Sequence, residues 1–402
     1  MQKKILITGA DGYMGSNLKK YLRRDYNIFS LLQKAGKNQK DVFEADITDL
    51  KAVEKIIKKV SPDVLIHTAA ISNLSECEKN KDLAYAVNFS GTKNIVDTIN
   101  KFNLKTNLVF FSSDYIFDGE KGNYKEEDTP NPKTVYGKSK LQAEEYIKKQ
   151  LKDYIICRTA NIYGRGGNFF NFLVDSLNEN KKIEIFNDVF YTPTYIDYLL
   201  DCLKLLIEKD FKGVIHVSGP ERVSRFEFAM KLMTIFNQKR NLIIPVNQPQ
   251  GGLIAKDNSL NSELVRGLLN NYCPSIEKSL HFCFGNLIPS YFHFKDERGL
   301  ISGIINRKRW GEINYFESQK GSVRGNHYHK KTEEGFYIIN GKIKVTIKNL
   351  IDNTSRVFFA EKGDIFLVKS FCIHTFEVMI DSCWMNFLSK RMSDRGKDFF
   401  RI

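Results

Sequence analysis

Three glycines near the start of the chain restrict its fold more than any other feature. Gly9, Gly12 and Gly15 follow the apolar run KILI at the spacing GxxGxxG, and a helical pattern over residues 16–24 comes next. Glycines at such a strand-to-helix turn let the backbone approach a pyrophosphate, whose charge then lies at the helix N-terminus. A plain tight turn could carry the same spacing, but the flanking strand and helix favour a dinucleotide-binding fold.

The first part of the chain alternates short apolar runs with helical patterns. DVLIHTAA precedes a helical pattern over 82–100, and NLVFFSS precedes a helix that begins near Tyr136. This alternation predicts βαβ units, in which a parallel sheet carries helices on both faces, as in a doubly wound α/β Rossmann fold. A helical stretch over 258–280 is expected near the end of this domain, to which we assign residues 1–287.

After about residue 287 the rhythm changes to short alternating runs broken by Gly, Asn and Asp. The runs are GEINYFES, EGFYIINGKIKVTIKNL, RVFFAEKGDIFLVKS and HTFEVMI. Such a series, without long helical patterns, indicates an all-β antiparallel barrel or sandwich. A chain of 402 residues is also long enough for two hydrophobic cores. We therefore assign residues 288–402 to a second domain.

Composition bears on partners and location. The net charge is +14, but the lysines are spread along the chain, which favours a basic surface over a nucleic-acid-binding stripe. The seven cysteines form no CxxC pair, which argues against a disulfide framework. We see neither a signal-peptide core nor an apolar run long enough to span a membrane. We expect a cytoplasmic protein with a nucleotide or phosphate ligand and no membrane insertion.

A tyrosine and a lysine four residues apart suggest a reducing site. Tyr136 and Lys140 in YGKSK would share one helix face, and Ser113 ends the run NLVFFSS. Because a nearby ammonium favours the phenolate, we expect the pKa of Tyr136 to fall towards neutrality. Ser113 could hold a carbonyl oxygen while Tyr136 protonates it and a nicotinamide supplies hydride. A solvated helix face is the alternative for YxxxK, but the glycine turn favours catalysis.

These motifs resemble the extended short-chain dehydrogenases/reductases, and within them the dTDP-4-dehydrorhamnose reductases. The likeness runs through SSDYIFDG, EEDTPNPKTVYGKSK, RTANIYG, NDVFYTPTYIDYL, HVSGPERVSRFEFA and DNSLNSEL, over residues 1–280. It implies that Ser113, Tyr136 and Lys140 are catalytic. Together with the small residues after the fourth strand, it implies a cofactor site formed by Gly9, Gly12, Tyr13, Met14, Gly15, Lys34, Asp46, Ile47, Ala69, Ala70, Tyr136 and Lys140.

Two regions bear on which cofactor and which sugar are bound. The second strand ends in Gln33-Lys34, with no acidic residue for a ribose 2′-hydroxyl, whereas Lys34 and Lys37 could meet a 2′-phosphate. We therefore expect NADP(H) ahead of NAD(H). Asn161 stands where these reductases usually carry Trp, in the motif RTxWVYG. It could bind a diphosphate or a sugar hydroxyl, or be a polar loop residue, so the sugar stays open.

The second domain contains histidines at a defined spacing. RGNHYHKKTEEGF carries His327, His329 and Glu334 in the pattern G(x)5HxH(x)4E(x)6G, and His374 follows later. Residues two apart on a strand face the same way, so the first two histidines would point together. Three imidazoles and a carboxylate suit Zn, Fe, Mn or Ni.

This spacing resembles the cupin motif, which implies a jelly-roll barrel with a divalent metal, zinc being the expected ion. The ligands implied are His327, His329, Glu334 and His374. The second cupin motif departs from the pattern, because Lys369 and Phe371 stand where Pro and Gly are usual. DERG, KGSVRGNHYH and the position of Glu334 resemble the C-terminal cupin of CapF-type capsular polysaccharide enzymes, which join a reductase to a zinc-bearing epimerase.

The segment RGNH supports two roles for its histidine. It is also similar to the dTDP-4-dehydrorhamnose 3,5-epimerases, in which the histidine is a base and no metal is needed. His327 would then be catalytic and remove a proton beside the keto group, instead of binding a metal. Arg324 could bind the substrate diphosphate, or form a surface ion pair.

Both halves then suggest one substrate, a nucleotide-linked 4-keto-6-deoxyhexose. A keto group acidifies the neighbouring hydrogens, so a cupin base could invert that carbon through an enolate. NADPH-dependent 4-keto reduction would fix the product, for surface polysaccharide (O-antigen or capsule) synthesis. The alternatives are a plain reductase with a non-catalytic cupin, a cupin ketoisomerase coupled to the reductase, and a scaffolding subunit that binds NADP(H) without turnover. The resemblance also implies a homodimer.

Overall fold

The computed structural model describes residues 2–34, 41–164, 166–236, 240–269, 272–289, 292–296, 299–305, 310–391 and 398–401. The chain divides into two compact units. Unit 1 comprises Met1–Ala229 and Ile243–Ile276, and unit 2 comprises Met230–Leu242 and Glu277–Ile402. The division that we predict at residue 287 stays a prediction.

Unit 1 is built on a seven-stranded parallel sheet in the order β11-β6-β5-β4-β1-β2-β3. Its strands are β1 (Lys4–Thr8), β2 (Asn27–Leu32), β3 (Val42–Glu44), β4 (Val64–His67), β5 (Asn107–Ser113), β6 (Tyr154–Thr159) and β11 (Gly213–His216). The central strands β1, β4 and β5 are almost entirely buried. Strands covered on both faces read as continuous apolar runs, as KILI and VLIH do. The predicted Rossmann-like α/β fold is confirmed.

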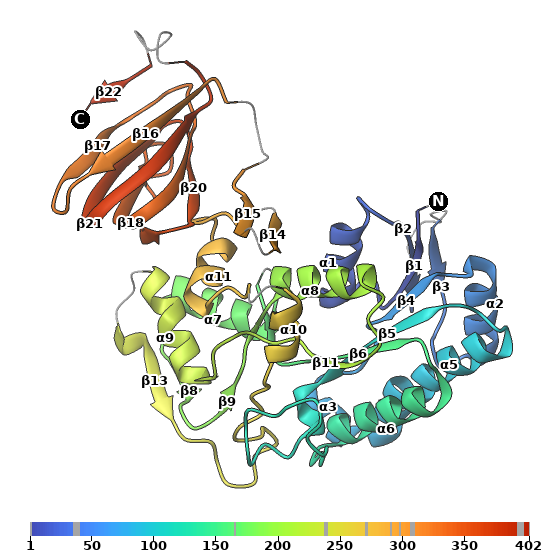
Figure 1. Ribbon diagram of the computed structural model, residues 1–402. Coiled ribbons are helices and arrows are strands. Elements are labelled where there is room, and N and C mark those ends of the chain that lie inside the picture. The colour runs from blue at the N-terminus through green and yellow to red at the C-terminus, as the bar shows by residue number, and fades with distance from the viewer. Residues whose placement is uncertain are drawn as a thin grey trace. The chain divides into compact units, whose positions relative to one another are not determined.

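Helices lie on both faces of this sheet (Figure 1). One face carries α2 (Leu50–Val60), α5 (Gly91–Lys101) and α6 (Val135–Gln150), and the other carries α1 (Tyr13–Leu22) and α8 (Ile196–Glu208). Polar side chains fix where the helices begin, because they accept hydrogen bonds from the first backbone N–H groups. Asp49 caps α2 in this way and Thr134 caps α6.

Shorter elements beyond β6 complete unit 1. Strand β7 (Ile162–Tyr163) pairs with β10 (Thr194–Tyr195), β8 (Ile183–Phe186) with β13 (Ile243–Val246), and β9 (Phe190–Tyr191) with β12 (Val223–Ser224). Helix α7 (Asn168–Asn178) lies among them in the chain, and α9 (Arg225–Phe236) follows β12.

Three helical predictions differ from the structure. Helix α1 begins at Tyr13, three residues before the predicted start, directly after the glycine turn. The pattern over 82–100 is divided into α4 (Lys81–Tyr85), a π-helical turn η1 (Ala86–Ser90) and α5. Among the described residues of the stretch 258–280, the helices are α10 (Glu263–Leu268) and the start of α11 (Ile276–Cys283), and residues 258–262 lie outside any helix.

Unit 2 contains an antiparallel sheet of seven strands. They are β16 (Glu312–Ser318), β17 (Val323–Tyr328), β18 (Glu334–Asn349), β19 (Ser355–Glu361), β20 (Ile365–Val368), β21 (Cys372–Leu388) and β22 (Phe400–Arg401). A separate hairpin joins β14 (Phe292–Asp296) and β15 (Gly299–Gly303). Phe336, Phe366, Phe376 and Trp384 pack together inside the sheet. An all-β antiparallel region is thus confirmed.

The runs predicted for unit 2 correspond to strands whose ends differ from the prediction: RVFFAEKGDIFLVKS divides into β19 and β20, and HTFEVMI is part of the longer β21. Gly341 does not end its strand but bends it, with φ of +101° and register shifts on either side. A side chain at this position would collide with Ser382 on β21, since a Cβ would lie 2.0 Å from its Oγ. Among the described helices of the whole chain, none is both long and apolar enough to cross a membrane.

Candidate active site and histidine cluster

The glycine turn lies between β1 and α1 and leaves no room for side chains. Gly9 has φ of +63°, and a Cβ on it would lie 2.8 Å from the Cα of Ala69. A Cβ on Gly15 would lie 2.2 Å from the carbonyl oxygen of Gly9. Both glycines therefore let β1, α1 and the end of β4 approach closely, and Tyr13 and Met14 open the helix beside the turn. Ala69 and Ala70, the small residues predicted to line the cofactor site, follow β4.

Asp46 and Ile47 lie just beyond the end of β3. Thr48 donates to Asp46 Oδ1 through both its backbone N–H and its hydroxyl, each at 2.8 Å, and these bonds hold the pKa of Asp46 below its usual value. Gln33 donates to the other carboxylate oxygen at 3.2 Å. Ile47 is buried against Gly91. Lys34 lies just after β2, and Lys37 falls outside the described residues.

Ser113 and Tyr136 meet at one cavity of unit 1. The cavity has a volume of about 590 Å³, and Tyr13 and Asn161 line it too. Ser113 ends β5, and Tyr136 lies in the first turn of α6. Lys140 lies one turn further along α6 and is buried, with its Nζ 3.9 Å from the centroid of the Phe110 ring. The fold thus brings the predicted serine and tyrosine to one space.

Burial shifts the pKa values of Lys140 and Tyr136 in opposite directions, each towards the neutral form of the side chain. Burial lowers the pKa of Lys140 to about 7, and the carboxylate of Glu144 acts against this shift. Burial also raises the pKa of Tyr136 above its ordinary value, only partly offset by the hydrogen bond with Ser113. The predicted fall in the pKa of Tyr136 is therefore wrong for the free protein, because desolvation outweighs any effect of Lys140.

Two ionisable residues of the same cavity could not be predicted from the sequence motifs. Asp114 and Arg225 both line it. Ser113 donates its hydroxyl hydrogen to Asp114 Oδ1 at 2.8 Å, and burial raises the pKa of Asp114 to about 7, with Arg225 acting in the opposite sense. Their only sequence signal is their place inside SSDYIFDG and PERVSRFEFA.

Asn88 is a further residue that sequence patterns did not reveal. It lies in the π-helical turn η1 and is buried. Its Oδ1 accepts from the backbone N–H of Ile71 at 2.8 Å, and its Nδ2 donates to the Ile71 carbonyl at 3.0 Å and to Ser139 Oγ at 3.1 Å. The loop after β4 is thereby fixed to α6, between Tyr136 and Lys140 in sequence.

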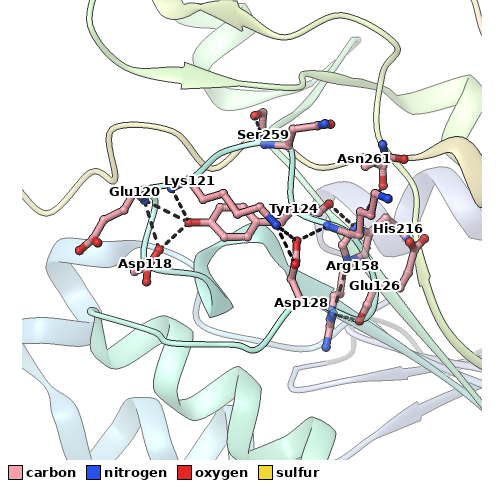
Figure 2. A network of polar contacts seen from close by, with 12 residues as sticks. Asp118, Glu120, Lys121, Tyr124, Glu126, Asp128, Arg158, His216, Ser259 and Asn261 are labelled. Atoms are coloured by element: carbon pink, nitrogen blue, oxygen red, sulfur yellow. Dashed lines mark hydrogen bonds and ion pairs between the residues drawn. The ribbon is translucent and has the colours of Figure 1, made fainter.

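Behind α6, a buried polar network joins the sheet to the loop that follows β5 (Figure 2). Arg158 on β6 donates to Glu144 Oε2 at 2.8 Å, and its Nη1 lies 3.3 Å from His216 Nε2. His216 Nδ1 lies 3.1 Å from the carbonyl oxygens of Tyr124 and Asn261, which only accept, so this nitrogen carries the hydrogen. Burial lowers the pKa of His216 to about 4, so the ring is neutral at pH 7.

In unit 2, the four predicted histidine and glutamate side chains come together. Glu334 Oε2 lies 3.2 Å from His374 Nε2, 3.6 Å from His329 Nε2 and 3.9 Å from His327 Nε2. One ligand atom each from His327, Glu334 and His374 lies within 4.8 Å of the others. Burial lowers the pKa of His374 to about 3, which leaves its ring neutral. We call these four residues the histidine cluster.

A β-bulge aims His327 at this cluster. His327 and His374 are register partners on β17 and β21, and the register shifts between Gly325 and His327. Gly325 and Asn326 have φ of +94° and +55°. Because a bulge interrupts the alternation of side chains along a strand, the directions of the side chains around it cannot be predicted from that alternation.

Lys369 and Phe371, which depart from the predicted second motif, lie between β20 and β21. Phe371 takes a φ of +60°, a conformation that glycine adopts more readily, and its backbone N–H donates to the His329 carbonyl at 2.6 Å. His374, three residues later, still reaches Glu334.

Arg324 lines a different pocket from the histidine cluster. Its Nε donates to Ser318 Oγ at 2.7 Å and its Nη2 to the Glu317 carbonyl at 3.1 Å. The pocket has a volume of about 660 Å³, and no member of the histidine cluster is among its described lining residues. A direct role of Arg324 beside His327 therefore stays a prediction.

Both halves of the chain are similar to known proteins. Residues 294–383 match the family described as polysaccharide biosynthesis C-terminal domain. The spore coat polysaccharide biosynthesis protein SpsK of Bacillus subtilis is 32% identical over 234 residues, which cover 57% of this chain and 78% of that protein. The dTDP-4-dehydrorhamnose reductase of Aggregatibacter actinomycetemcomitans is 32% identical over 239 residues, with the same coverage of 57% and 78%.

A solved structure extends this likeness to three dimensions. The dTDP-4-dehydrorhamnose reductase of Bacillus anthracis, in complex with NADP, is 31% identical and superposes with a TM-score of 0.64 over 71% of this chain and 99% of that one. Residues 3–270 match the family described as RmlD substrate binding domain. On the strength of that match, together with the parallel sheet and the cavity beside its glycine turn, this chain belongs to the RmlD family.

Proposed function

We propose that unit 1 reduces the 4-keto group of a nucleotide-linked 4-keto-6-deoxyhexose with NADPH, in polysaccharide biosynthesis. The observation that carries this proposal is the meeting of Ser113 and Tyr136 at one cavity, with Lys140 one turn behind. Two proteins to which the chain is similar are named dTDP-4-dehydrorhamnose reductase, and the solved structure of one of them contains NADP.

The glycine turn fits a dinucleotide. A Cβ at Gly9 or Gly15 would fill the space between β1, α1 and Ala69, so these glycines keep the N-terminus of α1 accessible to a pyrophosphate. Asp46 is held as a carboxylate that could accept from an adenine amino group. When bound, NADPH would supply the hydride. We propose Lys34 as the residue that meets its 2′-phosphate.

The side chains of the cavity can each take a defined role. The raised pKa of Tyr136 keeps its phenol protonated, which is the form that donates a proton to a carbonyl oxygen during reduction. Ser113 would hold the same oxygen. Arg225 and Asn161 line the cavity and are suited to the diphosphate and to sugar hydroxyls. The charged form of Lys140 would favour proton loss from Tyr136 in the reverse direction.

Replacement of Tyr136 tests this assignment. The protein is incubated with NADPH and a dTDP- or UDP-linked 4-keto-6-deoxyhexose, and NADPH oxidation is followed. Tyr136→Phe should lower the rate by about 10²–10⁴-fold because the general acid is lost. Tyr146→Phe is the matched control, since Tyr146 lies on the same helix but bonds to Asp97. Equal rates of NADPH oxidation by Tyr136→Phe and wild type would mean that Tyr136 is not the general acid, and no oxidation by either protein would favour a scaffolding protein that binds NADP(H) without turnover.

We also propose that unit 2 is a cupin whose histidine cluster holds a divalent metal. The donor set fits, because the Nε2 atoms of three imidazoles lie within 3.9 Å of one carboxylate oxygen of Glu334, and three imidazoles with a carboxylate suit Zn²⁺. When bound, the metal would supply positive charge next to a keto group. The neutral ring of His374 is in the state that ligation requires.

The reaction of unit 2 that we favour is epimerisation beside the carbonyl, before reduction. His327 is the most exposed of the three cluster histidines, with 16% of its side-chain surface accessible, so it could take a proton from substrate. The same position also suits a ligand, and a ketoisomerase or a non-catalytic sugar-binding domain would use the cluster differently. A homodimer and a cytoplasmic location remain part of this proposal.

A further inference from the structure

The C-terminal segment of the chain lies against the histidine cluster. Residues Phe400–Arg401 form β22, which pairs with β17 so that Arg401 is opposite His327 and Phe400 is opposite Tyr328. The rings of Phe400 and Tyr328 stack with centroids 5.1 Å apart. Residues 398–401, which we call the C-terminal strap, are thus fixed to the strand that carries the cluster.

Asp398 anchors this strap to the loop between β17 and β18. Its Oδ1 accepts from the backbone N–H groups of Lys330 and Lys331 at 2.9 and 2.8 Å, and its Oδ2 accepts from the Thr332 hydroxyl at 2.6 Å. Asp398 and Thr332 are both buried. The carboxylate therefore caps the loop in which His329 lies.

The backbone of Asp398 also sets the orientation of His329. His329 Nδ1 lies 2.7 Å from the Asp398 carbonyl oxygen. Because a carbonyl only accepts, Nδ1 carries the hydrogen, and in the neutral ring the lone pair is on Nε2. That nitrogen lies 3.6 Å from Glu334 Oε2, on the side of the cluster.

Phe399, the next residue, covers the first histidine of the cluster. Its ring centroid lies 4.4 Å from that of His327 and 5.7 Å from that of His329. Its side chain thereby limits the access of water to the cluster from this side.

We propose that the C-terminal strap organises the histidine cluster, with Asp398 as a positioning residue that presents His329 Nε2 as a metal ligand. This inference rests on the proposed metal site of unit 2. A hydrogen-bond acceptor behind a ligating histidine fixes its tautomer and ring orientation, and the loss of such a partner typically weakens metal binding by about 10–100-fold.

Zinc affinity of the full chain tests the proposal. The metal-free protein competes with a chromophoric chelator for Zn²⁺. Asp398→Ala keeps the backbone carbonyl but loses the three side-chain bonds that anchor the strap, so it should bind Zn²⁺ more weakly than wild type, by up to about 10–100-fold. Asp398→Asn should stay close to wild type, because its Oδ1 still accepts from Lys330 and Lys331 and its amide can donate to Thr332. Asp352→Ala is the matched control, since Asp352 caps an exposed turn through Thr354 in the same unit. Unchanged affinity of Asp398→Ala would overturn the proposal.

A second readout needs no metal. Nitrogen-15 NMR of the histidine rings reports which nitrogen carries the hydrogen, and the chain has only seven histidines. His329 should be the Nδ1–H tautomer in wild type and should lose this preference in Asp398→Ala. Thr332→Val, which removes one anchoring bond, gives a milder change if Asp398→Ala does not fold. A His329 that is not Nδ1–H in wild type would overturn the proposal.

The two failures are distinguishable. If wild type and His327→Ala bind Zn²⁺ equally weakly, the proposed metal site is wrong, whatever the tautomer shows. If wild type binds Zn²⁺ tightly and His327→Ala does not, but Asp398→Ala behaves as wild type, only the role of the strap is wrong.

Discussion

Lys140 is buried in a position where its charged form is disfavoured, and we expect this to lower the free energy of unfolding at acidic pH. Its pKa falls from 10.5 to about 7, while Glu144, on the same helix, acts to retain the proton. The buried His67 on β4 is neutral, with its pKa lowered to about 3, and Arg158 is engaged with Glu144. Below pH 7 the ammonium is charged in both the folded and the unfolded chain, and folding must desolvate it.

Lys140→Met should therefore raise the free energy of unfolding at pH 6 by a few kcal/mol. The upper limit is ~5 kcal/mol, the free energy that corresponds to the lowering of the Lys140 pKa. The folded wild type binds fewer protons than the unfolded chain between pH 7 and 10.5, so its stability rises with pH in that window. The difference between variant and wild type should shrink accordingly. Urea unfolding of the cofactor-free protein at pH 6, 7.5 and 9 would measure it. Parallel curves at every pH would contradict this account.

Residue spacing revealed part of the site. Tyr136 and Lys140 could be paired from sequence because a helix places residues four apart on one face. The direction of the Tyr136 pKa shift could not, because it depends on burial, which only the fold creates. Asp114 and Arg225 reach one cavity from separate parts of the sequence, so no local pattern joins them.

At the scale of elements, the stability of unit 2 should depend more on the glycine in the bulge of β17, Gly325, than on Gly321 in the turn before that strand. Gly325→Ala places a Cβ 2.4 Å from the His374 carbonyl oxygen, whereas Gly321→Ala meets nothing within 4 Å. Both glycines have positive φ, +94° and +83°, so both variants lose about 1–2 kcal/mol from backbone strain.

The clash should make Gly325→Ala less stable than Gly321→Ala by at least ~1 kcal/mol, because the pairing of β17 with β21 must shift. Urea unfolding of the two variants measures this difference. Equal losses would mean that the bulge can relax without disturbing His374.

Periodicity identified the elements better than it identified their ends. The apolar runs of unit 1 became parallel strands because both of their faces are covered. The glycine in EGFYIINGKIKVTIKNL suggested a break, but Gly341 only bends β18 against Ser382. The π-helical turn at Ala86–Ser90 lies inside a longer helical pattern, so the sequence predicts ordinary helix there.

At the scale of the whole molecule, proton exchange and hydride transfer should be separable. In deuterated water without NADPH, wild type should place deuterium beside the keto group of the sugar, and His327→Ala should not. With NADPH, Tyr136→Phe should still exchange deuterium while its NADPH oxidation falls. Mass spectrometry and NMR of the recovered sugar measure the exchange. NADPH oxidation by wild type with no deuterium uptake would mean a plain reductase and a non-catalytic unit 2.

The domain boundary at residue 287 stays a prediction. A change of rhythm near residue 287 indicated two domains. Contacts across the chain instead group Met230–Leu242 with Glu277–Ile402, and such non-local grouping leaves no trace in local composition.

That grouping affects how the protein can be made and recombined. The division falls within α9, between Ala229 and Met230, so one helix supplies residues to both units. During synthesis, Met230–Leu242 leaves the ribosome before most of unit 2 exists, and its contacts there can form only after the later segment emerges. A gene fusion cut once, near residue 287, would separate this segment from its partners. An exchange of unit 2 between relatives would need a second junction inside α9.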